Sequence, residues 1–343
     1  MTAPETVETA RTAETPATEA AGTGSDTRQA SHTPEEVRAA WVQATRPRTL
    51  PLAASGSLVA AGIAACAGAF RWEVFALMFV TSALLQVIAN FADDYGDLSH
   101  GLDDETRVGP KRGLQRGVIT MGQMKRALVG VSAATLVLGV ALVAVAFTGG
   151  PAMSGGSVVA AVVFVLLGIA SIAAAMLYTM GKHPYGYIGL GDFMSFLFFG
   201  VVAVVGGSFL YLHEFTWVSL VAAVALGCPV MAVMNVNNMR DAKRDAAKGK
   251  RTVANMLGDP GMRVYETVLL ALGAVLFVVA AAMCRATNPV SYVLLVASFA
   301  VWGKVLATMW RTPDPERFDR LMAPTSMGSV LVAVVWLAAV LIG

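Results

Sequence analysis

Charged side chains are scarce in this sequence. They make up 14% of the 343 residues, whereas they account for about a quarter of an ordinary water-soluble domain. Hydrophobic residues reach 56%, and the mean hydropathy is +0.63. Such a chain has too little charge for a water-soluble surface, so the composition excludes a soluble fold and predicts one that lies in a bilayer.

Cysteine is also rare, and neither sign of charge dominates. The three cysteines, Cys66, Cys228 and Cys284, lie within apolar runs and lack the spacing of metal ligands. A disulfide framework or zinc site is therefore not expected, and we interpret all three as packing residues. The formal net charge of +2 is too small to indicate a nucleic-acid partner.

Residues 1–38 differ in composition from everything that follows. They are rich in Ala, Thr, Glu, Ser and Gly and contain no aromatic residue. Such a segment cannot bury enough apolar surface to fold, and it has neither the apolar core of a signal peptide nor the acid-poor composition of a transit peptide. We predict a disordered cytoplasmic tail over 1–38 and one membrane domain over 39–343.

Apolar runs recur along the rest of the chain. A helix needs about 20 predominantly apolar residues to cross a bilayer, and none of the runs alternates as the strands of a membrane barrel do. The predicted spans are 50–70, 74–92, 127–147, 158–178, 193–212, 217–236, 268–284, 290–310 and 326–342. The expected fold class is therefore an all-α integral membrane protein with nine transmembrane helices.

Lys and Arg are distributed unevenly between the two ends of these spans. With the N-terminus in the cytoplasm, 22 of the 25 Lys and Arg fall in the tail and in the loops after spans 2, 4, 6 and 8. Only Arg71 and Arg285 fall on the opposite side. The positive-inside rule then predicts a multi-pass protein of the cytoplasmic (inner) membrane with its N-terminus in the cytoplasm.

Acidic residues gather at the predicted cytoplasmic end of span 2. On a helix, Asn90, Asp94 and Asp97 share one face because they are spaced i, i+4 and i+7, and Asp93 lies beside Asp97 one turn away. Close carboxylates repel one another unless a cation joins them, and Mg²⁺ is held by one or two carboxylates together with phosphate oxygens of a substrate. This spacing predicts a metal site on the cytoplasmic side.

A second acidic pair, Asp241 and Asp245, ends span 6 with the spacing i, i+4. A basic segment that contains glycine follows each acidic cluster, and its cations could bind the diphosphate that the metal also touches. Their candidate residues are Arg107, Lys111 and Arg112 after the first cluster, and Lys250 and Arg251 after the second. Either cluster alone is equally typical of a solvated helix cap, but the repetition on one membrane side indicates function.

Four motifs in order resemble the UbiA superfamily of membrane prenyltransferases over roughly residues 40–343. They are Asp93-Asp94-Tyr95-Gly96-Asp97, Arg107-Val108-Gly109-Pro110-Lys111-Arg112-Gly113, Asn237-Asn238-Met239-Arg240-Asp241 and Gly249-Lys250-Arg251-Thr252. The segments that begin at Arg46 and at Pro184 are most similar to the branch that prenylates 1,4-dihydroxy-2-naphthoate. Gly101 stands where the superfamily often has a further acid, with Asp103 and Asp104 beyond it, so the choice of acids at the first metal stays open.

The resemblance implies a central cavity open to the inner leaflet and a Mg²⁺-dependent reaction. A polyprenyl group would pass from polyprenyl diphosphate to 1,4-dihydroxy-2-naphthoate with loss of carbon dioxide and diphosphate, giving demethylmenaquinol for menaquinone synthesis. A related enzyme for 4-hydroxybenzoate or with a phytyl donor remains an alternative. A membrane transporter is the second alternative. The acids of a transporter would be expected at the bilayer midplane, whereas the acids here are predicted at one membrane face.

The resemblance also implies a role for each candidate residue. Metal would be bound by Asp93, Asp94, Asp97, Asp241 and Asp245; the catalytic set would be Asp94, Asp97, Asp241, Asp245 and Arg251. Diphosphate would be bound by Asn90, Arg107, Lys111, Arg112, Lys250 and Arg251. The acceptor would be bound by Arg46, which would meet its carboxylate, and by Tyr178.

Overall fold

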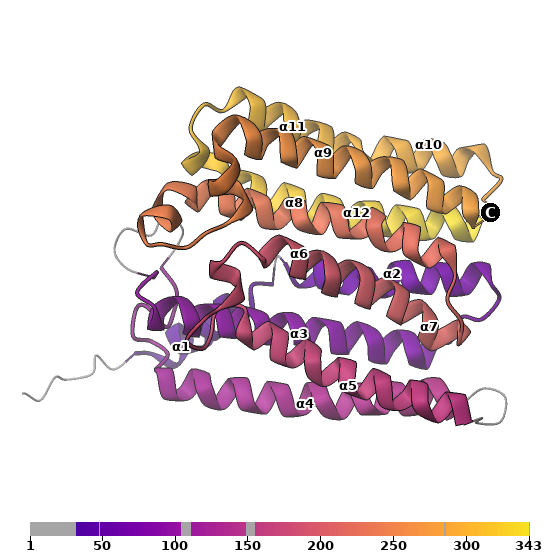
Figure 1. Ribbon diagram of the computed structural model, residues 1–343, viewed down its shortest axis with the longest axis horizontal. Helices are drawn as coiled ribbons and strands as arrows, with labels where there is room; N and C mark the ends of the chain where they lie inside the picture. Colours follow the sequence, from indigo (N-terminus) through magenta and orange to yellow (C-terminus); the bar gives the residue numbers. More distant parts are fainter. Residues whose placement is uncertain (1–31, 48, 104–110, 149–154, 285, 343) are drawn as a thin grey trace, which may run out of the picture.

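The structure, a computed structural model, describes residues 32–47, 49–103, 111–148, 155–284 and 286–342. Helices follow one another through all of these ranges (Figure 1), and the described residues form no β-structure beyond a single bridge between Ile188 and Arg251. The helices are α1 (Pro34–Thr45), α2 (Leu50–Cys66), α3 (Trp72–Ser99), α4 (Met121–Thr148), α5 (Gly155–Leu177), η1 (Tyr185–Tyr187), α6 (Gly191–Ser195), η2 (Phe196–Gly206), α7 (Gly207–Leu212), α8 (Trp217–Ala247), α9 (Val253–Met283), α10 (Pro289–Ser298), α11 (Ala300–Arg311), η3 (Pro315–Phe318) and α12 (Asp319–Ile342).

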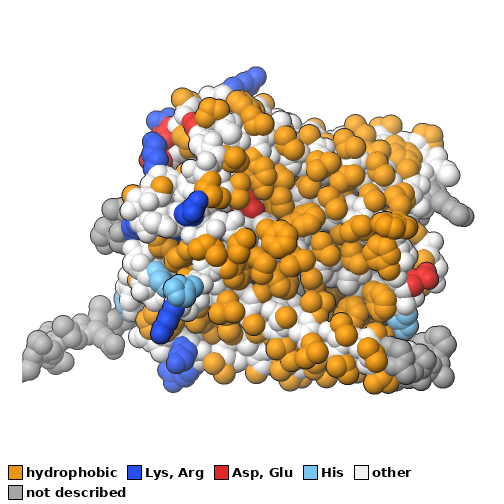
Figure 2. Space-filling view, viewed as in Figure 1, with side chains coloured by type: hydrophobic (Ala, Val, Ile, Leu, Met, Phe, Trp, Pro, Cys, Tyr) orange, Lys and Arg blue, Asp and Glu red, His pale blue; other side chains and the backbone are white. Residues whose placement is uncertain are grey.

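The helices have the length and composition of membrane spans. Within the described ranges, eight helical segments are long and apolar enough to cross a bilayer, and α1 with α2 would form a ninth if they make one bent span. Hydrophobic side chains cover most of the face in Figure 2, whereas Lys and Arg gather toward one end of it. The all-α membrane fold expected from the sequence is confirmed.

Helix α1 begins within the range for which the sequence predicts a tail. Thr33 and Glu36 form a capping box, each side chain bonding the backbone N–H of the other residue, and Pro34 fits the first helical turn. Ala40 and Ala44 are buried, and Trp41 contacts the ring of Phe91 on α3 edge-on. The tail boundary at residue 38 is therefore wrong, since residues 34–38 are helical; residues 1–31 lie outside the described part of the chain.

Small residues let the central helices approach closely. Figure 1 shows α8 and α9 to α12 on one side of the bundle and α3 to α5 on the other, with α2, α6 and α7 between them. Gly200 of η2, a π-helical segment, faces Gly227 of α8, where an added Cβ would meet the opposing backbone. On α2, Gly62 packs against the ring of Trp336, whose indole N–H donates to the carbonyl of Phe277 on α9.

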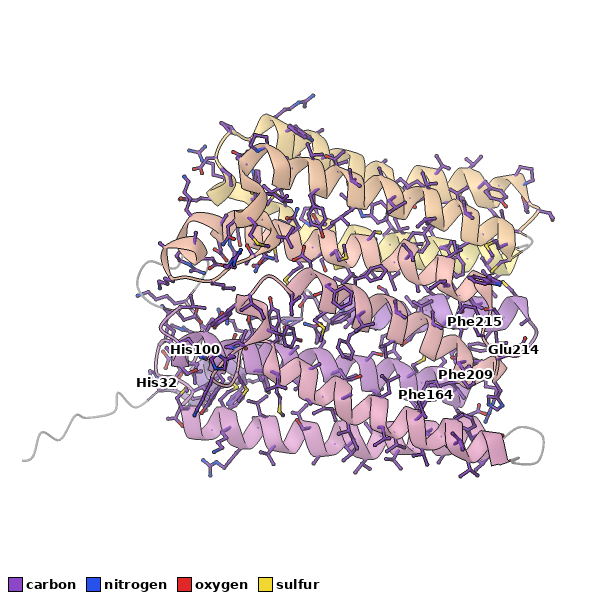
Figure 3. All side chains as sticks on the ribbon, viewed as in Figure 1. His32, His100, Phe164, Phe209, Glu214 and Phe215 are labelled. Atoms are coloured by element: carbon purple, nitrogen blue, oxygen red, sulfur yellow. The ribbon has the colours of Figure 1, made fainter. Side chains whose placement is uncertain are left out.

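Two long helices carry the acidic clusters to one end of this bundle. The predicted spans 74–92 and 217–236 continue without a break as α3 to Ser99 and α8 to Ala247, so all five predicted metal-binding aspartates lie on helices, as expected. His100, just after α3, lies at this end, whereas Glu214 lies at the opposite end (Figure 3). The fold thus brings both clusters to one side of the membrane-spanning region.

Candidate active site

A cavity of about 760 Å³ lies among α2, α3, α4, α5, η2 and α8. Its apolar walls include Leu85, Leu136, Val140, Phe164, Phe198 and Val233, and its polar end is lined by Arg46, Asn90, Asp93, Asp94, Asp97, Arg112, Tyr178, Asn237, Arg240, Asp241, Arg244 and Lys250. The cavity is therefore amphipathic, with charged groups at one end and room for an apolar chain along the rest.

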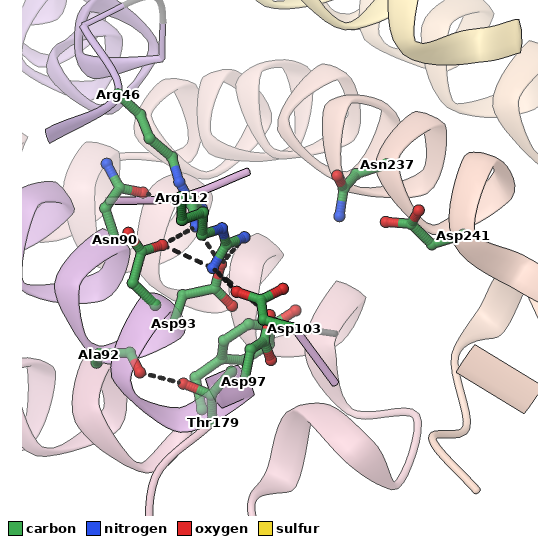
Figure 4. A network of polar contacts seen from close by, with 12 residues as sticks. Arg46, Asn90, Ala92, Asp93, Asp97, Asp103, Arg112, Thr179, Asn237 and Asp241 are labelled. Carbon is green, nitrogen blue, oxygen red and sulfur yellow. Dashed lines mark hydrogen bonds and ion pairs between the residues drawn. The ribbon is translucent and has the colours of Figure 1, made fainter. Parts of the chain in front are cut away.

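The first acidic cluster surrounds the guanidinium of Arg112 (Figure 4). Its nitrogens lie 2.6 Å from Asp94, 3.1 Å from Asp93, 3.5 Å from Asp103 and 3.6 Å from Asp97. The side chain is only 12% exposed, so these ion pairs are poorly screened by water. One arginine from the loop after α3 thereby neutralises part of a group of four carboxylates.

Arg46 contacts the same cluster from the other side. Its guanidinium donates to Asp93, to Asp94 at 2.8 Å and to the Asn90 amide oxygen at 3.5 Å. The backbone of Arg46 adopts a left-handed conformation with φ of 51° directly after α1, which is uncommon for a residue other than glycine. The turn between α1 and α2 thus directs this side chain onto the acids.

The second acidic cluster faces the first across the cavity, as Asn237 and Asp241 show in Figure 4. Arg240 binds both carboxylate oxygens of Asp241, at 3.1 and 2.6 Å, and also contacts Asp319 of α12 at 2.6 Å. Asp245 lies 3.6 Å from Arg244 and 3.4 Å from Lys250. Each described acid of the predicted metal site is therefore paired with a cation of the chain.

Lys250 connects the two clusters. Burial alone would lower the pKa of this ammonium, but the carboxylates of Asp97 and Asp245 raise it above its ordinary value, so the side chain stays charged. Its Nζ also lies 5.5 Å from the centre of the Tyr187 ring, whose hydroxyl donates to Asp97 at 3.0 Å. The segment after α5 therefore contacts both half-sites.

Gly96 explains why that segment can lie so close to α3. A Cβ at this position would collide with the backbone carbonyl of Thr179, and the Thr179 hydroxyl donates to the carbonyl of Ala92 at 2.7 Å. Thr179 is completely buried. The glycine within the first acidic motif is thus required for close packing next to the aspartates.

Not all predicted site residues reach the cavity. The side chains of Lys111 and Arg251 are exposed and do not line it, although the backbone of Arg251 bonds that of Tyr187. Asp245 is buried just behind the cavity wall. Arg107 lies outside the described residues, so its predicted role concerns a part of the chain about which the structure says nothing.

Tyr178 and Asn90 also lie on the cavity wall. The Tyr178 hydroxyl donates to the sulfur of Met234 at 3.5 Å, and burial raises the pKa of this phenol, so it remains neutral. Asn90 donates to the carbonyl of Thr45 at 2.9 Å and accepts from Gln86 at 2.8 Å. The asparagine is therefore held between α1 and α3, at the edge of the first cluster.

The donor chemistry of the two clusters fits a hard divalent cation. The candidate ligands are carboxylate oxygens, which Mg²⁺ prefers, and the buried Asp245 Oδ1 accepts no hydrogen bond. Within the described ranges, no three acidic, histidine or cysteine side chains are arranged so that they enclose an ion. Cations of the chain, chiefly Arg46, Arg112 and Arg240, lie where they neutralise these acids instead.

Sequence reasoning did not assign roles to Asp103 or Tyr187. Asp103 is buried and close to Arg112, but it follows the end of α3 and has no helical spacing with the other acids. Tyr187 occurs in a quoted motif, yet only the path of its loop places it on Asp97. In the sequence, the only feature that marks Tyr187 is its position between Gly186 and Gly189.

The helical bundle and its amphipathic cavity define a multi-span membrane protein with a site for a substrate that has an anionic head and an apolar chain. The family model described as "UbiA prenyltransferase family" matches residues 54–332, and the chain belongs to this family. It is an enzyme that transfers prenyl groups.

Its relatives agree with this assignment, and a solved structure shares the fold. The "1,4-dihydroxy-2-naphthoate octaprenyltransferase" of Haemophilus influenzae is 34% identical over 88% of this chain and 96% of the relative. The protein of the same name from Escherichia coli is 42% identical over 67% of this chain and 72% of the relative. A UbiA homologue from Aeropyrum pernix, 17% identical, covers 88% of this chain and 98% of its own with a TM-score of 0.59, a likeness of fold.

Proposed function

We propose that this enzyme transfers a polyprenyl group from polyprenyl diphosphate to 1,4-dihydroxy-2-naphthoate in menaquinone synthesis. The amphipathic cavity carries the proposal, because one end offers cations and acids while the remaining walls suit an isoprenoid chain. Two similar proteins bear a name with this acceptor and an octaprenyl donor. The ring carbon that bears the carboxylate would attack the allylic carbon as its bond to diphosphate breaks; carbon dioxide would then leave and restore the aromatic ring.

The diphosphate would be held at the polar end of the cavity. Arg112 and Lys250 are the cations best placed for it, because both line the cavity. Arg112 lies within the first acidic cluster, and Lys250 lies between Asp97 of the first cluster and Asp245 of the second. Lys111 and Arg251 are exposed, so we assign them a weaker contribution, through attraction of the anion to the cavity mouth. Buried guanidinium and ammonium groups would stabilise the negative charge that develops on the leaving diphosphate.

The acids would hold Mg²⁺ between the two helix ends. Asp93, Asp94 and Asp97 would act from α3, and Asp241 and Asp245 from α8. When bound, the metal supplies positive charge that stabilises the departing diphosphate. Arg46 and Arg112 neutralise the first cluster and Arg240 the second, so these arginines would keep the acids from repelling one another.

The acceptor would lie beside α1 and Tyr178. Arg46 reaches the cavity at the level of the first cluster, where its guanidinium could pair with the acceptor carboxylate. Tyr178, a neutral phenol on the cavity wall, would face the positive charge that develops on the allylic carbon. We assign the acidic end to the cytoplasmic side of the inner membrane, on the basis of the Lys and Arg distribution.

The test is the mass of the product made by the purified enzyme in nanodiscs. It is supplied in turn with 1,4-dihydroxy-2-naphthoate and 4-hydroxybenzoate, each with prenyl diphosphates of several chain lengths and with Mg²⁺ or a chelator. We expect prenylation of the naphthoate, release of one carbon dioxide per product, and loss of activity in chelator. Preferential prenylation of 4-hydroxybenzoate would contradict the acceptor, and activity in chelator would contradict the metal.

A further inference from the structure

The cavity extends far from the acidic clusters along α3. Asp94 and Met78 both line it, and both belong to this helix. They are 16 positions apart in the sequence, which corresponds to about 24 Å along a helix axis. A prenyl chain whose diphosphate lies at the acidic end would therefore extend deep into the membrane-spanning part of the bundle.

Phe164 of α5 lines the cavity at the same depth as Met78. A Cβ added to Gly206 would lie 3.5 Å from the Phe164 ring, and a Cβ added to the adjacent Gly207 would lie 2.9 Å from the Met78 sulfur. In Figure 3, Phe164 lies toward the end of the bundle opposite to that of His100. Phe164 is therefore at the far end of the cavity, away from the acids.

Other aromatic rings support Phe164 from outside the cavity. Its ring stacks on Phe209 of α7, with 5.5 Å between ring centres, and lies 6.2 Å from the ring of Phe147 on α4. Phe147 in turn stacks on His213 at 4.9 Å. None of these three supporting residues lines the cavity, so a ligand that reaches this depth meets the Phe164 ring, which α4 and α7 hold in place.

Two glycines leave open space one helical turn nearer the acids. Gly168 of α5 follows Phe164 by four positions, and Gly139 of α4 precedes Val143, another lining residue, by four. Both glycines line the cavity, and a Cβ added to either would have no atom within 4 Å. Unlike Gly96, neither is needed for the close approach of two segments. Since glycine is a poor helix former, what it provides at these positions is room within the cavity.

We propose that Gly139, Gly168 and Phe164 determine which lengths of prenyl chain the enzyme accepts. The inference rests on the proposed function, in which a prenyl diphosphate is the donor. With its diphosphate at the acidic end, the chain passes the two glycines and then meets the Phe164 ring. A side chain at either glycine would fill space that a long chain needs and a short chain does not reach, whereas removal of the Phe164 ring would lengthen the cavity.

Steady-state kinetics of the full-length enzyme in nanodiscs tests this limit. The donors run from geranyl to decaprenyl diphosphate, and kcat/KM for each donor is divided by the value for geranyl diphosphate. This ratio does not depend on the fraction of a variant that folds. One methylene group more or less in an apolar pocket changes discrimination by about 10- to 200-fold. Gly168→Leu and Gly139→Leu should therefore lower the ratio for the longest donors by at least about tenfold, and Phe164→Ala should raise it.

Two variants outside the cavity control for the substitutions themselves. Gly130 lies on α4, is exposed, and has no atom within 4 Å of an added Cβ. Phe79 is a partly exposed aromatic residue of α3. Neither residue lines the cavity, so Gly130→Leu and Phe79→Ala should keep the ratios of the wild type.

Several results would overturn the proposal. Unchanged ratios in the cavity variants would show that a long chain leaves the cavity sideways into lipid. A loss in Gly168→Leu that is equal for all donors, or equal to that in Gly130→Leu, would show an effect on the helix and not on chain length. An unchanged ratio in Phe164→Ala would show that the cavity does not end at this ring.

Protection from thermal unfolding by the same diphosphates, without an acceptor, separates this inference from the proposed function. Length-dependent protection that the cavity variants alter, in an enzyme that does not prenylate the naphthoate, would contradict the acceptor and support the length limit. A wild-type enzyme that none of the diphosphates protects or converts would contradict both the proposed donor and the length limit.

Discussion

Replacement of Arg112 by glutamine should destabilise the folded enzyme as well as inactivate it. Removal of one partner from a buried ion pair costs about 3–5 kcal/mol, because the remaining charge is left uncompensated. Here Arg46 still contacts Asp93 and Asp94, and the Tyr187 hydroxyl still donates to Asp97. We therefore expect the lower end of that range, about 3 kcal/mol.

The assay is thermal unfolding of the purified enzyme in nanodiscs, with chelator and with Mg²⁺. At roughly 2 °C for each kcal/mol in a chain of this size, Arg112→Gln should lower the melting temperature by about 6 °C in chelator. Mg²⁺ should raise the melting temperature of the variant by more than it raises that of the wild type, because the ion replaces the missing positive charge.

Two variants control for the substitution itself. Lys111→Gln removes an exposed positive charge from the adjacent residue, and we expect almost no change in melting temperature. Arg112→Lys keeps the positive charge but loses the planar guanidinium that can bind two carboxylates at once. Its melting temperature should therefore lie between those of the wild type and Arg112→Gln. Equal melting temperatures for Arg112→Gln and Lys111→Gln would refute the view that Arg112 neutralises the first cluster.

Three further substitutions test how the site is assembled. Gly96→Ala should displace the segment after α5 and abolish activity, whereas Gly122→Ala, on an open face of α4, should not; equal activities would contradict the close packing. Tyr187→Phe removes one hydrogen bond to a carboxylate, about 1.5–3 kcal/mol, and should lower kcat/KM at least tenfold without unfolding the protein; an unchanged kcat/KM would exclude a positioning role. Lys250→Gln should raise the KM for prenyl diphosphate far more than Arg251→Gln, as measured by steady-state kinetics; the reverse order would reassign the diphosphate contact.

The sequence was sufficient for the features that depend on helical periodicity. Apolar runs predicted the spans, and the i, i+4 and i+7 spacing predicted that Asn90, Asp94 and Asp97 would share one helix face. These relations are local, since the pitch of a helix determines them. The repetition at the end of α8 then placed the second acidic pair at the same end of the bundle.

The features that the sequence could not supply depend on the path of loops and on contacts between distant helices. Arg112 lies among four carboxylates because this residue, which follows α3 in the sequence, contacts the acidic end of that same helix and Asp103. The contact of Tyr187 with Asp97 depends on the close approach that Gly96 permits.

The start of α1 shows where prediction from composition alone is wrong. Composition predicts a tail over residues 1–38 because apolar residues are rare there, but a capping box needs only Thr33, Glu36 and the helix formers that follow. Local hydrogen bonds can begin a helix in a polar segment when its far end packs against the domain. Here Trp41 on Phe91 supplies that packing.

We propose that the two facing acidic clusters act together on one prenyl diphosphate. The most direct test is the single-turnover rate of Asp94→Asn and Asp241→Asn with 1,4-dihydroxy-2-naphthoate and saturating Mg²⁺. The control is Asp314→Asn, because Asp314 caps η3 and does not line the cavity. Each 1.4 kcal/mol lost from transition-state stabilisation costs about a factor of ten in rate, and a metal contributes several such steps. We expect both cluster variants to lose at least three orders of magnitude (~10³-fold) while folding normally, and the control to match wild type. Rates within tenfold of wild type in either cluster variant would contradict the two-cluster site.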